Sequence, residues 1–116
     1  MTSCCSRAFL IAVFLLITGR ALAEDRVLDL AIQGGVPPAQ PQILSVLQND
    51  RVVLRLTSDK PVQVHLHGYD IESDVAPGRA TSLRFTASAT GRFPIEIHSH
   101  DPRRQRPLAY LEVRPR

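Results

Sequence analysis

Apolar and polar residues alternate with a period of two along most of the chain after residue 24. In the segment 51–57, for example, Val52, Leu54 and Leu56 fall on one side of an extended backbone. Successive side chains of a strand point to opposite faces, so this alternation predicts half-buried strands, and no segment has the period of a helix. The expected strands are 27–33, 43–47, 51–57, 62–67, 81–86, 93–98 and 108–113.

Residues that favour turns separate these segments. Gly34-Gly35 and a cluster of prolines follow the first strand, and Gly or Asp residues lie between most of the others. About seven short strands at regular spacing predict an all-β sandwich or small barrel. Pro94 cannot donate a ladder hydrogen bond, so we expect it at a sheet edge or a bulge.

The first 23 residues differ from the rest of the chain. Arg7 precedes an apolar run of 11 residues at 8–18, and Ala21-Leu22-Ala23 follows that run. A bilayer-spanning helix needs roughly 20 apolar residues. The order of the three regions is typical of a secretory signal peptide. We therefore expect cleavage after Ala23, a single mature domain at 24–116, a periplasmic or secreted location and no permanent membrane anchor.

Removal of such a leader changes both the cysteine count and the charge. Cys4 and Cys5 are the only cysteines, so the mature chain would have no disulfide and no thiolate. Arg7 and Arg20 would also leave, and the formal net charge would fall from +3 to +1. That charge gives no support for nucleic-acid binding. The local excess of Arg103, Arg104 and Arg106 is either a solvated loop or a docking patch for an exported partner.

All four histidines lie in two His-x-His pairs, His65/His67 and His98/His100. Residues i and i+2 of a strand share a face, about 6.6 Å apart along the chain. Each pair ends an apolar strand, so we expect a metal site at one end of the sandwich, with all or some of the four imidazoles as ligands. If the two pairs lie on different sides of the sandwich, they would form two weak sites instead of one shared site. The alternative is that these histidines are polar groups on a strand face, bonded to neighbours or to solvent.

Neutral imidazole suits several divalent transition metals, whereas Cu(I) prefers sulfur ligands. A mature chain without Cys or Met therefore favours Cu(II), with Zn(II) as the other candidate. Carboxylates near the pairs are candidates for orienting the imidazole N–H groups, although most are expected in loops. These carboxylates are Asp70, Glu72, Asp74 and Asp101.

The order of these motifs resembles that of cupredoxin-like domains, and in particular the first domain of multicopper oxidases. The similarity covers roughly residues 43–113 and is carried by His65-Leu66-His67-Gly68, Ala76-Pro77-Gly78, Gly91-Arg92-Phe93 and His98-Ser99-His100. The resemblance implies a Greek-key β-sandwich. In that family the two His pairs belong to a copper cluster shared with a second domain. The blue-copper Cys is absent, because Ile97 occupies its place.

The resemblance favours an exported copper-binding protein with a site made of histidines alone, which carries or buffers copper. One alternative is a metal-free cupredoxin-fold module that docks on an exported partner through the arginine-rich loop. Another is a small copper-dependent redox protein. The chain contains no Gly-x-Ser-x-Gly elbow and no glycine-rich phosphate loop, so we expect no catalytic residue of those kinds.

Overall fold

A computed structural model describes Gly19 and residues 25–116. The predicted leader, apart from Gly19, lies outside the described residues. The described part contains eight strands and one short 3-10 helix. The strands are β1 (Asp25–Ile32), β2 (Gln42–Leu47), β3 (Arg51–Ser58), β4 (Val62–Leu66), β5 (Ile71–Val75), β6 (Thr81–Thr86), β7 (Gly91–Ile97) and β8 (Pro107–Arg114), and the helix is η1 (Pro102–Arg104).

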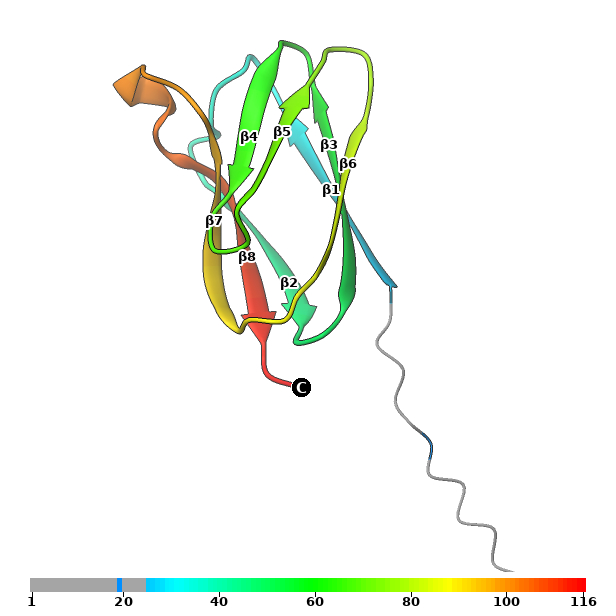
Figure 1. The fold of residues 1–116 in the computed structure, drawn as a ribbon. Helices are drawn as coiled ribbons and strands as arrows, with labels where there is room; N and C mark the ends of the chain where they lie inside the picture. Colours follow the sequence, from blue (N-terminus) through cyan, green and yellow to red (C-terminus); the bar gives the residue numbers. More distant parts are fainter. Residues whose placement is uncertain (1–18, 20–24) are drawn as a thin grey trace, which may run out of the picture.

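The strands form two sheets that face each other (Figure 1). One sheet has three strands in the order β1-β3-β6, and the other has five in the order β2-β8-β7-β4-β5. The pairs β1–β3 and β2–β8 are parallel, and the other neighbours are antiparallel. The predicted all-β sandwich is therefore confirmed.

The core fills the space between the two sheets. The inward-facing positions of the alternating strands are almost fully buried, and the largest of these side chains are Leu54, Leu56, Leu66, Ile95, Leu108 and Leu111. Burial of apolar surface is the main force that holds such a sandwich together. The opposite residues of each strand are left on the outer faces, where the histidines of the expected site lie.

Each of the seven predicted strands matches an observed one to within two residues at either end. The prediction missed β5, and it was wrong to expect Glu72 and Asp74 in a loop. These two acids point outward from β5, whereas Val75 points into the core. Because two of the five residues of β5 are acidic, its sequence does not show a clear apolar alternation. The segment is a strand because it pairs with β4 along its whole length, from Val62 to Leu66.

Pro94 lies in an internal strand, because β7 has β8 on one side and β4 on the other. Of the two predicted alternatives, the edge position was therefore wrong, and the ladder with β8 has a bulge or irregularity close by. The register between β7 and β8 shifts between Ile95 and Glu96, next to the proline. The Pro94 carbonyl still accepts a hydrogen bond from the His67 N–H at 3.0 Å. The ladder with β4 covers only the residues from Ile95 to Ile97, so Pro94 lies just beyond it, where a missing N–H is tolerated.

Candidate metal centre

The two His-x-His pairs lie at the C-terminal ends of β4 and β7, which are antiparallel neighbours in the five-stranded sheet. His65 is in β4 and His67 follows it, whereas His98 and His100 both follow the end of β7. His65 lies directly opposite Glu96, and the His98 N–H donates to the Gln63 carbonyl at 2.8 Å. The carboxyl ends of antiparallel strands point in opposite directions, so a site at one end of the sandwich was the wrong expectation. The pairs instead meet on the outer face of the sheet.

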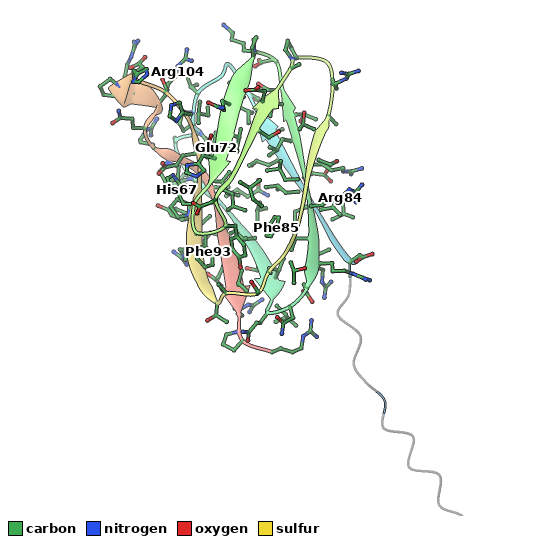
Figure 2. All side chains as sticks on the ribbon, viewed as in Figure 1. His67, Glu72, Arg84, Phe85, Phe93 and Arg104 are labelled. Atoms are coloured by element: carbon green, nitrogen blue, oxygen red, sulfur yellow. The ribbon has the colours of Figure 1, made fainter. Side chains whose placement is uncertain are left out.

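Alternation along the strands explains why the histidines point outward. Val64, Leu66 and Ile95 are fully buried, whereas the residues between them are partly exposed. Figure 2 shows His67 on the outer side of the sheet, below the loop that carries Arg104. The core therefore fixes the backbone beneath the site and leaves the imidazoles accessible.

Three of the four histidines line one small pocket of about 140 Å³. The lining residues are His65, His67, Glu96, Ile97, His98, Ser99 and Gln105. His100 is exposed and does not belong to this lining. The rings of His65 and His67 are 4.1 Å apart between centroids, whereas those of His98 and His100 are 6.0 Å apart. The first pair is thus the more compact.

Two carboxylates stand beside the imidazoles in different positions. Glu96 lines the pocket, and its Oε2 lies 2.9 Å from the Nε2 of His67, within hydrogen-bond distance. Glu72 lies on β5 outside the lining, and its Oε1 is 4.0 Å from the Nδ1 of His65. Among the carboxylates predicted to orient the rings, Glu72 is therefore close to a histidine.

Asp101 is engaged elsewhere. Its carboxylate accepts hydrogen bonds from the backbone and the guanidinium of Arg103, and this arrangement caps η1. The hydrogen bond from the Arg103 side chain is the largest cause that lowers the pKa of Asp101 below its ordinary value. Asp101 thus neutralises one of the three loop arginines.

The other two predicted carboxylates belong to β5 and to the connection before it. Asp74 is in β5 and pairs with Gln63 of β4, and Asp70 has a positive φ of 51° in the connection between these strands.

Gly68 allows the chain to turn directly after His67. Its φ is 84°, and a Cβ at this position would lie 2.3 Å from the Cδ1 of Phe93. Phe93 in turn makes an edge contact with Tyr69, whose hydroxyl donates to the Ala89 carbonyl at 2.8 Å. The end of β4, and with it His67, is therefore held against a packed aromatic cluster.

The donor chemistry of the pocket suits a copper or zinc ion, because imidazole is a common ligand of both and carboxylates stand nearby. The side chains do not yet surround a common point. Among the described residues, no group of three or more His, Cys, Asp and Glu side chains is arranged closely enough to hold a metal ion. An ion that binds the Nε2 of His67 would have to replace the contact of that atom with Glu96.

Sequence reasoning did not identify Glu96, Ser99 or Gln105 as pocket residues. Glu96 is two residues before His98, so strand alternation could have placed both on one face. Ser99 would face away from His98 if the strand continued, but β7 ends at Ile97 and the alternation stops there. Gln105 reaches the pocket from the irregular loop after η1, which no periodic pattern describes.

Comparison with known proteins bears on the fold. A multicopper oxidase from Pseudomonas thermotolerans matches with a TM-score of 0.64 and 22% identity, over 82% of this chain and 31% of that chain. A copper-binding protein solved in its apo form by NMR matches with a TM-score of 0.61 and 11% identity, over 77% of this chain and 87% of that chain. The periplasmic domain of cytochrome oxidase subunit II from Bradyrhizobium japonicum matches with a TM-score of 0.50 and 19% identity, over 64% of this chain and 54% of that chain.

The chain spans 31–42% of the length of four copper oxidases with similar structures. No family model matches the sequence, and no curated protein matches it. In the part of the chain that the structure describes, no helix has the length and hydrophobicity needed to cross a membrane. The structural similarities, at low identity, show that the chain has a cupredoxin-like fold.

Proposed function

We propose that this cupredoxin-like domain is an exported copper-binding protein that carries or buffers Cu(II). His65, His67 and His98 hold the ion in a nitrogen-rich, non-blue site. His100 lies outside the pocket lining and is not one of these three ligands. One observation carries the proposal. Imidazoles at the ends of β4 and β7, about thirty residues apart in sequence, line the same pocket.

The choice of ion follows from the donors. Residues 25–116 contain neither Cys nor Met, so the site offers no sulfur to Cu(I) or to a blue-copper centre. Imidazole nitrogen is a good ligand of Cu(II), and Zn(II) accepts the same donors. When bound, such an ion supplies a Lewis-acidic centre at the outer face of the sheet. Solved copper proteins of the same fold, including one periplasmic domain, support the proposal.

Export is the second part of the proposal. It rests on the basic residue, the apolar run and the small-x-small site of residues 1–23, which we expect to be removed. A disulfide-free mature domain is compatible with a periplasmic location. The cytochrome oxidase domain of similar structure is also periplasmic.

Single substitutions test the site. We expect His65→Ala and His98→Ala each to abolish tight Cu(II) binding in a competition titration, because each removes an imidazole that lines the pocket. His100→Ala serves as the matched control, and we expect it to keep most of the affinity. Tight binding that survives both His65→Ala and His98→Ala would show that copper is not held in this pocket.

A second candidate function is that of an interaction module that docks on an exported protein. The observation that favours it is the loop of η1, which forms part of the pocket wall through Gln105 and carries Arg104 and Arg106 on either side. This function predicts that a defined exported partner co-purifies at low salt and is lost in the double variant Arg104→Glu/Arg106→Glu. Absence of any partner at low salt would count against it.

A further inference from the structure

We propose that Glu96 is the fourth ligand of the metal site, so that the pocket takes divalent ions through three nitrogens and one carboxylate oxygen. This inference rests on the proposed function and refines the expected histidine-only site. It makes Glu96, which no sequence motif singles out, part of the binding machinery.

The position of Glu96 among the three imidazoles carries the argument. It lies directly opposite His65 across the β4–β7 pair, and it lines the same pocket as His98, which follows the end of β7. Its carboxylate is already 2.9 Å from the Nε2 of His67. Cross-strand and diagonal neighbours on one face of a sheet are close enough for their side chains to meet. Glu96 thus lies beside His65 and His67 and shares the pocket lining with His98.

The contrast with Glu72 separates a ligand from an outer carboxylate. Carboxylates that only orient a metal-bound histidine stand behind the ring, on the side away from the ion. Glu72 fits that description, because it lies outside the pocket lining, its side chain is 51% exposed and it faces the Nδ1 of His65 at 4.0 Å. Glu96 is part of the lining and only 29% exposed.

The hydrogen bond to His67 explains how one residue serves both states of the site. Without an ion, Glu96 holds the Nε2 of His67. When an ion takes that nitrogen at about 2.0–2.1 Å, the carboxylate oxygen beside it is left within reach of the same ion. The one polar contact would thus be replaced by two coordination bonds.

The ligand set predicts which ions are held. Carboxylate oxygen and imidazole nitrogen suit Cu(II) and Zn(II), whereas Cu(I) prefers thiolate and thioether sulfur. We therefore expect the site to bind both divalent ions and to bind Cu(I) more weakly.

The test compares Glu96→Gln with Glu72→Gln in the purified protein. Cu(II) and Zn(II) are titrated against a competing chelator, and the Cu(II) forms are examined by electron spin resonance. We expect Glu96→Gln to weaken Cu(II) binding by at least about tenfold and to change the spectrum as an oxygen ligand is lost. We expect Glu72→Gln to leave the spectrum unchanged. Glu96→His should restore tight binding with a spectrum of four nitrogen ligands.

The outcomes separate this inference from the proposed function. If the unmodified protein holds no Cu(II), the proposed function fails. If it binds Cu(II) and Glu96→Gln has the same affinity and spectrum, the site stands but Glu96 is not in it. If Glu96→Gln weakens binding with an unchanged spectrum, Glu96 acts only by positioning His67, which overturns its assignment as a ligand.

Discussion

Gly68 is a single residue on which the position of His67 depends. It combines a left-handed backbone with a close approach to Phe93, so there is no space for a side chain. The glycine that follows the first His-x-His pair is therefore explained by packing. It lets the chain leave β4 immediately after the imidazole and cross the aromatic cluster.

We expect Gly68→Ala to lower the free energy of unfolding by about 2–4 kcal/mol, since a Cβ there adds both an unfavourable φ and a clash with a buried ring. Chemical denaturation measures the change. Gly78→Ala is the control, because its φ of 75° is similar but no atom lies within 4 Å of the added Cβ. Equal losses in the two variants would show that the contact with Phe93 is unimportant.

The histidines could be selected from the sequence, but the ligand set could not. The spacing of His65 and His67 shows that they share a face, and the same holds for His98 and His100 if the strand continues. Only the register of β4 against β7 shows that His98 faces Gln63 and that Glu96 faces His65. Register depends on pairing between distant segments, which alternation within one strand does not specify.

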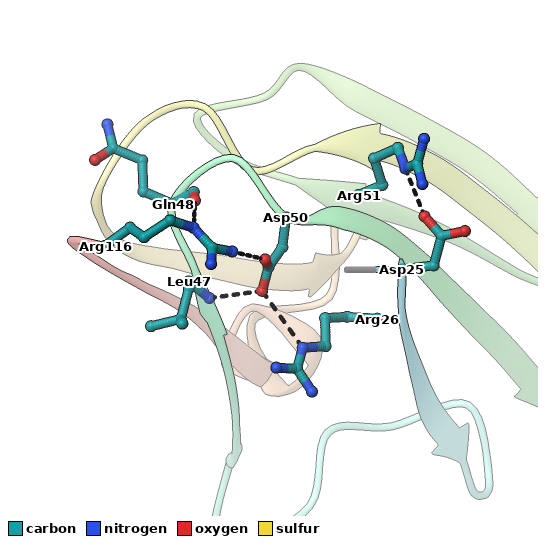
Figure 3. Close-up of polar contacts among 7 residues, drawn as sticks. All are labelled: Asp25, Arg26, Leu47, Gln48, Asp50, Arg51 and Arg116. Carbon is teal, nitrogen blue, oxygen red and sulfur yellow. Dashed lines mark hydrogen bonds and ion pairs between the residues drawn. The ribbon is translucent and has the colours of Figure 1, made fainter. Parts of the chain in front are cut away.

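At the scale of elements, the buried carboxylate of Asp50 links three parts of the chain. Asp50 is fully buried and accepts from the Leu47 N–H at 3.0 Å, from the Nε of Arg26 at 3.4 Å and from Arg116 (Figure 3). Arg26 belongs to β1, Leu47 ends β2, and Arg116 follows β8. The turn between β2 and β3 is thus tied to an edge strand of one sheet and to the C-terminal end of the other.

We expect Asp50→Ala to lower the free energy of unfolding by about 1–3 kcal/mol, because it leaves the Leu47 N–H without its side-chain acceptor and removes one ion-pair contact from each of two arginines. Asp25→Ala is the control. Asp25 also pairs with an arginine, Arg51, at 2.6 Å, but its side chain is 64% exposed, and exposed pairs contribute little. Thermal or urea unfolding of both variants measures the difference, and an unaffected Asp50→Ala protein would contradict this role.

The strands themselves were largely predictable, because their inner positions are apolar and their outer positions polar. β5 was not, since Glu72 and Asp74 occupy outer positions of a short edge strand whose inward face includes Ser73. Its stability comes from the ladder with β4 and from the burial of Val75. Such tertiary support overrides the weak preference of acidic residues for strands.

At the scale of the whole molecule, the sandwich provides a rigid support for a site on one outer face. The core fixes β4 and β7, and the imidazoles stand on the surface that these strands leave exposed. An ion that binds only the folded site must stabilise the whole domain, because binding and folding are linked. The stability of the folded domain therefore reports metal binding independently of any activity.

We expect Cu(II) at a free concentration of 100 times its Kd to raise the free energy of unfolding by about 2.7 kcal/mol. Differential scanning calorimetry with and without Cu(II) checks this, and a chelator should reverse the shift. The His65→Ala/His98→Ala double variant is the control. A shift of the same size in that variant would place the stabilising ion outside the pocket.

Removal of the leader, residues 1–23, is a prediction for the intact chain. We expect the exported protein to begin at Glu24, because Ala21-Leu22-Ala23 provides the small residues that a signal peptidase requires. Intact-mass measurement of protein recovered after secretion gives the cleavage position. Protein that keeps residues 1–23 after export would contradict the proposal.

The most direct test of the central claim is a Cu(II) titration of the purified protein, followed by electron spin resonance of the copper form. We expect one tightly bound Cu(II) per chain with a nitrogen-rich, non-blue spectrum. No binding, or only the loose binding of exposed surface histidines, would contradict it and leave a cupredoxin-like fold that works without a metal ion.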